Sequence, residues 1–228
     1  MLDAVRIALL DALAVLAPVE CAGCGAPDRA VCADCRGELN AAEPFAVALD
    51  GVAVPVLVAL SYAGVARAIL LAFKDAGRTD AARHLAVPLL AALAAALRAL
   101  PPGLAGEVEL VAIPSTRAAY RRRGYAPVRA ILVAAGLRGS NLLRPVRQTR
   151  DQAELTERER AENRAGSLAA RPIAAGRTVV VVDDIVTSGA TLREAIRALE
   201  SAGAHVAAAV AVARTERRHP KPAHGRET

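Results

Sequence analysis

Residues 179–191, which read VVVVDDIVTSGAT, restrict the fold of this chain more than any other feature. Four consecutive valines suit a parallel strand that is buried on both faces, and the periodicity of residues 190–202 predicts a helix soon afterwards. A strand, a loop and a helix in this order indicate an α/β fold, in which ligands bind near the ends of strands. The unpaired N–H groups of the loop and of the first helical turn form an anion site, best suited to a phosphate.

Two adjacent carboxylates, Asp183 and Asp184, indicate which phosphate compound would fit. A nucleoside triphosphate loop would offer a lysine after its glycines, and this loop has none. Carboxylates accept strong hydrogen bonds from hydroxyl groups, so an acidic pair beside a phosphate site favours the vicinal diol of a ribose 5-phosphate. The alternative, an ordinary strand followed by a capped helix, would leave two acids at the end of a buried strand without a partner, which costs free energy.

The same segment closely resembles the signature of type I phosphoribosyltransferases, in which an acidic pair follows a hydrophobic strand and precedes a Thr/Ser/Gly loop. The resemblance implies that Asp183 and Asp184 hold the 2- and 3-hydroxyls of phosphoribosyl pyrophosphate. It also implies that the loop holds the 5-phosphate of this compound. The corresponding loop residues are Thr187, Ser188, Gly189, Ala190 and Thr191.

All the cysteines of the chain lie in one cluster, spaced as CxxC, seven intervening residues and CxxC. They are Cys21, Cys24, Cys32 and Cys35. Each CxxC can place two thiolates on one tetrahedral ion, which predicts a four-cysteine zinc ribbon or knuckle. Four thiolates leave no open coordination position, so we expect the zinc to be structural. Disulfide bonds are the alternative, and they require an oxidising compartment.

The length of 228 residues allows one sizeable core and a small appendage, and the net charge of +6 is compatible with phosphorylated or nucleic-acid partners. Residues 1–20 are largely apolar, but they carry Asp3 and Asp11, lack a positive start and place Glu20 directly before the first cysteine. This pattern does not fit a signal peptide and predicts an amphipathic helix. We therefore expect a cytoplasmic protein without membrane insertion.

The rest of the pattern is that of a sheet flanked by helices. Asp50 and Gly51 lie between two apolar runs, 45–49 and 52–60, and predict a hairpin. Helices are expected at 61–76 and 79–100, and strands at 108–113, 142–146 and 205–213. The expected domains are an N-terminal helix with a zinc ribbon at 1–44, a phosphoribosyltransferase-like domain at 45–214, and a disordered basic tail at 215–228.

Taken as a whole, the chain resembles the ComF family, bacterial proteins that join a four-cysteine zinc motif to a phosphoribosyltransferase-like domain. Some of these proteins are needed for DNA uptake during natural transformation. Besides the cysteines and residues 179–191, the likeness rests on four further segments and covers about residues 15–213. These are TyrAlaGly at 62–64 with Lys74 and Gly77, IleProSer at 113–115, ArgArgArgGlyTyr at 121–125, and the spaced set Arg147, Thr149, Gln152, Leu155, Arg160 and Asn163.

One position departs from the family pattern. After the ArgGlyTyr step the family usually has Asn-Gln, whereas this chain has Ala126 and Pro127. The contact that the amide pair makes in the family therefore stays open for this chain.

The resemblance to transferases implies roles for residues outside the signature. A turn after the first sheet strand would bind pyrophosphate, and Ser115, Thr116 and Arg117 stand in that place. Arg117 would neutralise the leaving group, unless it is a solvated arginine. Lys74 would reach a phosphate, unless it is an exposed charge at a helix end. Mg²⁺ would be held mainly by the pyrophosphate and water.

Residues 147–163 fall where such folds carry a mobile loop over the site. The lid candidates are Arg147, Gln152, Arg160 and Asn163. For Gln152 and Asn163, a polar helix surface is an equally good interpretation.

Two classes of function remain open at this point. The first is an enzyme that transfers a phosphoribosyl group to an unidentified acceptor. The second is a non-catalytic module that senses a nucleotide or binds single-stranded DNA during uptake, with the zinc ribbon as a docking surface for uptake proteins. Arginines 121–123 would follow a nucleic-acid backbone, and Tyr120 and Tyr125 would offer stacking platforms. The acidic pair and loop favour ligand binding in both classes.

Overall fold

The computed structural model describes residues 19–27, 29–101, 104, 108–146 and 165–215 of the chain. The expected N-terminal helix, the expected tail after residue 215 and all four lid candidates lie outside the described residues.

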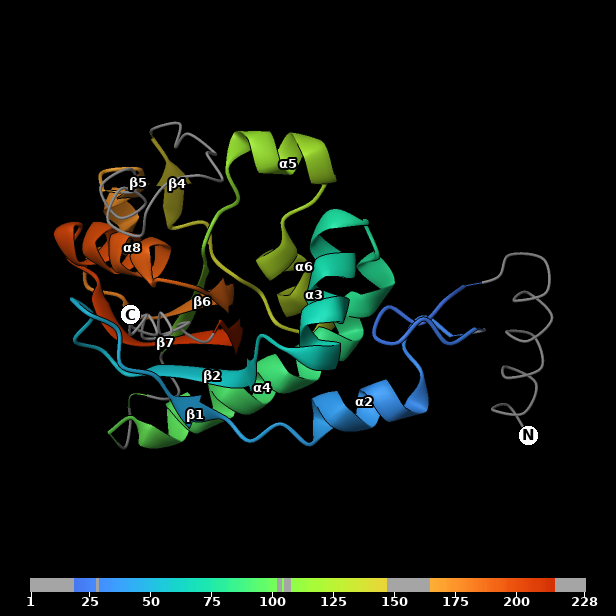
Figure 1. Ribbon diagram of the computed structural model, residues 1–228. Coiled ribbons are helices and arrows are strands. Elements are labelled where there is room, and N and C mark those ends of the chain that lie inside the picture. The colour runs from blue at the N-terminus through green and yellow to red at the C-terminus, as the bar shows by residue number, and fades with distance from the viewer. Residues whose placement is uncertain (1–18, 28, 102–103, 105–107, 147–164, 216–228) are drawn as a thin grey trace, which may run out of the picture.

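A five-stranded sheet in the order β1-β2-β7-β6-β3 forms the centre of the molecule (Figure 1). Its strands are β1 (Phe45–Ala46), β2 (Val56–Ser61), β3 (Glu109–Ala112), β6 (Thr178–Val186) and β7 (His205–Arg214). The strands β2, β7, β6 and β3 are parallel to one another, and β1 alone pairs in an antiparallel manner, with β2. The carboxyl ends of the four parallel strands therefore share one edge of the sheet.

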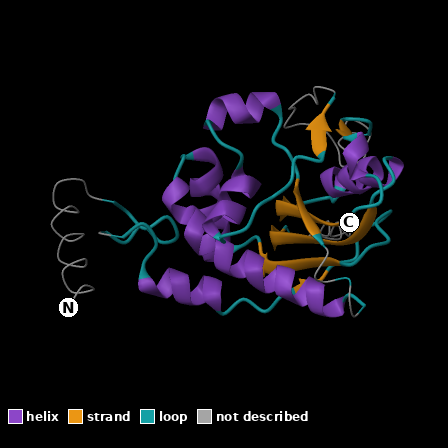
Figure 2. Ribbon diagram, turned by 180° about the vertical axis from the view of Figure 1, so that it is seen from behind, coloured by secondary structure: helices purple, strands orange, loops and turns teal. Residues whose placement is uncertain are grey.

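Helices cover both faces of this sheet (Figures 1 and 2). Helix α4 packs against β2 and β7, and α8 packs against β5, β6 and β7. The helices are α2 (Ala33–Asn40), α3 (Gly64–Asp75), α4 (Ala82–Ala99), α5 (Arg117–Arg123), α6 (Pro127–Ala134) and α8 (Ala190–Ser201), with short 3₁₀ turns η1 (Thr79–Ala81) and η2 (Pro172–Ala174). This mostly parallel sheet with helices on both sides confirms the predicted α/β class.

The alternation of side chains along β6 divides the core in two. Val180 and Val182 belong to the apolar cluster that contains Phe73 of α3, whereas Val179 and Val181 belong to the cluster on the α8 side. Successive side chains of a strand point to opposite faces, so a run of four valines fills both layers at once. Asp184 follows Val182 on the α3 side of the sheet, where its carboxylate meets Lys74.

Several boundaries differ from those expected. Ser61, expected to begin a helix, continues β2 and pairs with Arg214 of β7, so α3 begins only at Gly64. The expected strand at 52–60 begins at Val56, after Pro55, which has no N–H group to donate to a ladder. The hairpin is present, with the turn at Asp50 and Gly51, but its β1 strand has only two residues.

The expected strand at 142–146 forms outside the main sheet. It is β4 (Leu143–Pro145), which pairs in an antiparallel manner with β5 (Leu168–Ala170) to make a separate two-stranded sheet. Neither β5 nor α6 was expected from the sequence. The sequence pattern showed an apolar run but not its partner, because the two strands lie about twenty residues apart across a polar segment.

One helical segment in the described part of the chain, Thr79–Ala99, is long and apolar enough to cross a membrane. It consists of η1 and α4, and half of its most apolar window is buried inside the fold. Its buried side, which includes Leu85, Leu89 and Leu93, packs on the sheet, as expected for a core helix.

Glu194 holds the small β4–β5 sheet against α8. Its carboxylate is 4 % exposed, accepts a hydrogen bond from the backbone N–H of Leu168 at 3.0 Å, and pairs with Arg197 at 2.7 Å. Arg197 in turn donates to the carbonyl of Leu168 at 3.2 Å. Burial by itself raises the pKa of Glu194, but the hydrogen bonds from Arg197 and from the N–H groups of Leu168 and Gly166 outweigh it, so the pKa lies below its ordinary value.

We expect Glu194→Gln to lower the free energy of unfolding by about 1–3 kcal/mol at pH 7, the range for a buried hydrogen-bonded charge. Because the folded-state pKa is lowered, this stabilisation is complete above about pH 4.3 and is lost as the pH falls through the folded-state value. Urea unfolding of both proteins between pH 3 and pH 8 measures the difference. The exposed Glu200→Gln on the same helix is the control and should change stability little. A difference that stays constant down to pH 3 would contradict the assignment.

Candidate functional site

A pocket of about 350 Å³ opens at the carboxyl ends of the parallel strands. Its walls come from the end of β6 and the loop after it, the turn after β3, the last turn of α3, and the α5–α6 region. The predicted site residues that line it are Lys74, Ser115, Thr116, Asp183, Asp184, Thr187 and Thr191. Segments more than 100 residues apart in the chain therefore meet around one cavity.

The acidic pair occupies the end of the longest apolar run. Strand β6 continues through both acids to Val186, so the backbone holds them in an extended conformation. Asp184 is 6 % exposed, and its backbone N–H donates a hydrogen bond to the carboxylate of Asp183 at 2.8 Å. This bond orients the carboxylate of Asp183 at the rim of the pocket.

Lys74 lies opposite the acids and is not an exposed charge at a helix end. Its Nζ atom lies 3.0 Å from Oδ1 of Asp184, and the two side chains are 21 % and 9 % exposed. A carboxylate this well buried requires a compensating charge, which Lys74 supplies. The last turn of α3 is thus placed by the acidic end of β6.

The last turn of α3 is also held from the other side, by the segment that joins α5 to α6. Arg123 donates from Nε to the carbonyl of Lys74 at 2.7 Å, and the hydroxyl of Tyr125 donates to the carbonyl of Phe73. The rings of Phe73 and Tyr125 lie 5.3 Å apart. These side chains satisfy carbonyls that a helix end leaves unpaired, and burial raises the pKa of Tyr125.

Helix α5 presents one of its faces to the pocket. Thr116 caps its start by accepting a hydrogen bond from the N–H of Ala119 at 3.1 Å. Ala119, Arg122 and Arg123 lie three to four residues apart, which places them on one side of the helix, and all three line the pocket. Arg117, the first residue of α5, is exposed and is not among the lining residues.

Arg122 and Arg123 are therefore the pocket arginines that sequence reasoning missed. Both stand in the ArgArgArg run, but their side of the helix depends on where α5 begins. The N-cap at Thr116 fixes this phase. Tyr62, Pro127 and Thr215 also line the pocket without having been predicted as site residues. Pro127 is the first residue of α6 and offers an apolar wall.

The loop after β6 depends on one glycine. Gly189 has a φ of +75°, in the left-handed region, and is the residue before α8. A Cβ atom at this position would lie 2.9 Å from Cδ1 of Leu49 in the β1–β2 hairpin. Backbone conformation and the close approach of Leu49 both require glycine here. The hydroxyl of Ser188 accepts a hydrogen bond from the N–H of Ala190 at 3.4 Å.

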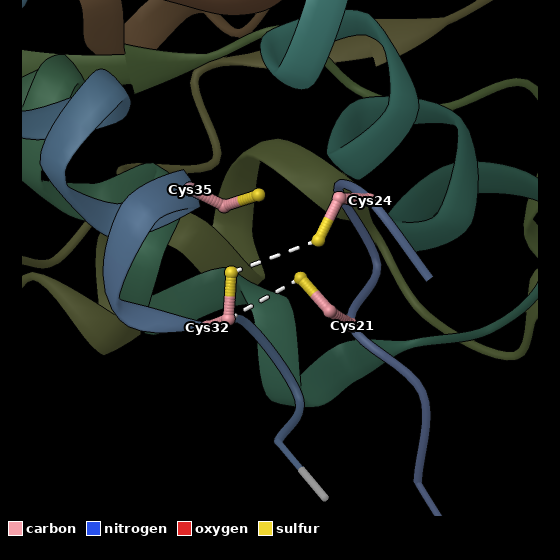
Figure 3. A group of neighbouring side chains, drawn as sticks. All are labelled: Cys21, Cys24, Cys32 and Cys35. Carbon is pink, nitrogen blue, oxygen red and sulfur yellow. Dashed lines mark hydrogen bonds between the residues drawn. The ribbon is translucent and has the colours of Figure 1, made fainter. Parts of the chain in front are cut away.

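The four cysteines form a second cluster, at the N-terminal end of the described chain (Figure 3). Their Sγ atoms all lie within 4.8 Å of one another, and those of Cys24 and Cys32 are 3.7 Å apart. All four are free cysteines, and this separation is far longer than a disulfide bond of about 2.05 Å. Zn–S bonds of about 2.3 Å in a tetrahedron place sulfur atoms about 3.8 Å apart, so the donor set and its spacing fit zinc.

Backbone groups favour the thiolate form of Cys21. Burial by itself raises the pKa of this thiol, but hydrogen bonds from the N–H groups of Cys32, Cys24 and Gly23 lower it to about 6. The N–H groups of Gly23 and Cys32 lie 3.4 Å and 3.3 Å from the sulfur. A thiol that is ionised at neutral pH is ready to bind a cation.

The comparison with protein families bears on the pocket. Residues 121–227 match the phosphoribosyl transferase domain. The matched segment contains β6, α8 and β7, together with Arg122, Arg123 and both acids. No curated protein matches the chain. The structure therefore combines a phosphoribosyl transferase domain with a four-cysteine cluster that is able to bind a metal such as zinc.

We expect Gly23→Ala to weaken zinc binding. A Cβ atom at residue 23 would lie 2.7 Å from Sγ of Cys35 and 3.2 Å from Cγ1 of Val65, so it would displace a ligand sulfur. Disturbing the surroundings of metal ligands lowers affinity about 10- to 100-fold. Competition with a chromophoric chelator measures the effect.

Gly37→Ala is the matched control, because this exposed glycine of α2 has open space around its Cβ position. It should bind zinc as the wild type does. Equal zinc affinity in all three proteins would show that the sulfur positions do not define the metal site.

Proposed function

We propose that the protein binds phosphoribosyl pyrophosphate, or a related ribose 5-phosphate, together with Mg²⁺, and transfers the phosphoribosyl group to an acceptor. The observation that carries this proposal is the position of Asp183 and Asp184 at the end of β6, next to the Thr/Ser/Gly loop and inside the pocket. Two carboxylates beside a loop that leads into a helix N-terminus combine acceptors for a diol with N–H donors for a phosphate.

The charges around the pocket support a ligand with several negative groups. The acids lie on β6, whereas Lys74, Arg122 and Arg123 line the pocket from α3 and α5. Three cations thus outnumber two carboxylates. A ribose that carries both a 5-phosphate and a pyrophosphate would place its diol at the acids and its phosphates at the loop and the cations.

Each part of the pocket then has a proposed role. Asp183 and Asp184 accept hydrogen bonds from the 2- and 3-hydroxyls. The loop binds the 5-phosphate, through Thr187, Ser188, Gly189, Ala190 and Thr191. Ser115 and Thr116 bind pyrophosphate in the turn after β3. Because Arg117 lies outside the pocket lining, we assign the neutralisation of the departing pyrophosphate to Arg122, Arg123 and Lys74.

These residues stabilise charge rather than attack the sugar. Phosphoribosyl transfer passes through an oxocarbenium-like state, in which negative charge develops on the leaving pyrophosphate. Bound Mg²⁺ supplies further neutralisation of that charge. The carboxylates keep the ribose in place, and the cations favour departure of the pyrophosphate as its bond to the anomeric carbon breaks. The acceptor then forms its own bond to the anomeric carbon.

We further propose that the four cysteines hold a structural zinc ion and that the protein works in the cytoplasm. A complete set of four thiolates leaves no position for a substrate. A reducing compartment keeps such thiols available for the metal. Freshly purified, reduced protein should contain about one zinc per chain, and clearly less zinc would contradict this part of the proposal.

Calorimetric titration with phosphoribosyl pyrophosphate and Mg²⁺ tests the ligand. We expect the wild type to bind, and Asp183→Asn and Asp184→Asn each to bind about 10- to 100-fold more weakly, because each loses charge-assisted hydrogen bonds of about 1.5–3 kcal/mol. Inorganic pyrophosphate has no diol, so its affinity should not fall in Asp183→Asn. Asp184→Asn also removes the partner of Lys74, so its affinity for pyrophosphate does not serve as a control.

The exposed Glu200→Gln of α8 is the control for both titrations and should behave as the wild type. A wild type that does not bind phosphoribosyl pyrophosphate would refute the proposed ligand. Transfer is tested separately, by release of pyrophosphate across a panel of nucleobases.

A second candidate function rests on the outer face of α5. Arg117 and Arg121 are exposed, and Tyr120 between them is 52 % exposed. This spacing puts a basic and aromatic surface on the side of α5 away from the pocket, which suits a single-stranded nucleic acid. The resemblance to ComF proteins makes DNA uptake the setting for this alternative. This alternative would be favoured by salt-dependent oligonucleotide binding that is lost in Arg117→Ala/Arg121→Ala, together with no release of pyrophosphate from phosphoribosyl pyrophosphate in the presence of any base.

A further inference from the structure

Arg78 connects the cysteine loops to the end of α3. Its Nη1 donates to the carbonyl of Glu20 at 2.9 Å, and its Nη2 lies 3.3 Å from the carbonyl of Ala30. Glu20 directly precedes Cys21, and Ala30 lies two residues before Cys32. One guanidinium group therefore contacts the backbone beside both CxxC pairs.

The position of this guanidinium is fixed by Asp80. Nε of Arg78 lies 3.1 Å from Oδ1 of Asp80, and Nη2 lies 3.0 Å from Oδ2. This two-pronged pair uses one edge of the planar group and leaves the other donors for the two carbonyls. A lysine has no such fork and cannot make all three contacts at once.

The backbone of Arg78 is held to the last turn of α3. The N–H groups of Ala76 and Arg78 both donate to the carbonyl of Ala72, at 3.1 Å each. Gly77 between them has a φ of +68°, which allows the chain to reverse. Lys74 lies inside this same turn, and its Nζ reaches Asp184. The cysteine loops and the pocket lysine are therefore joined through five residues.

The cysteine cluster also touches the beginning of α3. The Cα atom of Gly23 approaches Val65 closely enough that a Cβ would lie 3.2 Å from Cγ1 of that residue. Cys21 and Cys35 belong to the same apolar cluster as Phe73. The cysteine cluster therefore contacts the beginning of α3 directly, and it contacts the turn after the end of α3 through Arg78.

We propose that Arg78 is a positioning residue that couples metal occupancy at the four cysteines to the placement of Lys74 in the pocket. A bound metal fixes the two CxxC pairs relative to each other and thereby aligns the carbonyls of Glu20 and Ala30 for one guanidinium. Arg78 then holds the turn after α3, and Lys74 stays on Asp184. Without metal, the two carbonyls lose their common alignment, and this turn loosens.

This coupling rests on the proposed function for its effect on ligand affinity, and it is reciprocal by thermodynamic linkage. Metal binding and ligand binding should strengthen each other by the same factor, within the range of about 5- to 150-fold that is typical of coupled sites.

Hydrogen exchange tests the coupling without any ligand. In the wild type, removal of zinc should raise exchange both in the cysteine loops and in residues 72–80. In zinc-loaded Arg78→Met, residues 72–80 should already exchange fast while the cysteine loops remain protected, and removal of zinc should add no further change at 72–80. Arg78→Lys should behave as Arg78→Met, because it keeps the charge without the fork.

Arg67→Met, at an exposed position of α3, is the control and should respond to zinc removal as the wild type does. The coupling is refuted if residues 72–80 of the wild type do not respond to zinc removal, or if Arg78→Met responds as the wild type does. Zinc content measured alongside shows whether each variant retains its metal, so loss of folding around the cysteines is recognised.

Titration with phosphoribosyl pyrophosphate and Mg²⁺ then measures the effect on the pocket. Zinc-free wild type should bind about 5- to 150-fold more weakly than zinc-loaded wild type, and this ratio should approach one in Arg78→Met. Absence of binding by zinc-loaded wild type would refute the proposed function, whereas the exchange measurements would still decide the coupling. Equal affinity with and without zinc in a wild type that binds would refute the coupling.

Discussion

The buried carboxylate of Asp184 is the constraint on which the arrangement around the pocket depends. A charge that is almost removed from water must be paired, and the pairing cation here comes from a helix 110 residues earlier in the chain. The ion pair holds the last turn of α3 against β6. The backbone carbonyls of this turn accept hydrogen bonds from Arg123 and Tyr125, and these bonds position the segment that joins α5 to α6. The pocket is thus a consequence of satisfying one acid at the end of a central strand.

The last turn of α3 receives contacts from three directions: from the sheet through Asp184, from the α5–α6 segment through Arg123 and Tyr125, and from the cysteine loops through Arg78. Each contact satisfies a backbone carbonyl or a charge. A turn held in this way is rigid only while all its partners are in place, and this is the physical basis of the proposed coupling between the cysteine cluster and the pocket.

Local features were predictable from the sequence, and long-range ones were not. The pattern of residues 179–191, with its valine run, acids and loop, correctly predicted β6 and α8. This was possible because the periods of a strand and of a helix are visible in neighbouring residues of the sequence. The pairing of β4 with β5 and the contact between Lys74 and Asp184 join distant residues that carry no shared pattern. The choice of Arg122 and Arg123 over Arg117 required the helical phase of α5, which shifts by 100° for each residue of uncertainty in its start.

Both edges of the central sheet are protected in the described part of the chain. On one side the two-residue β1 covers β2, and on the other the backbone of Ser140 bridges to Val111 of the four-residue β3. Long open strands are templates onto which other chains can add. Here the valine- and alanine-rich strands β6 and β7 lie inside the sheet, so their pairing with another chain requires prior unfolding.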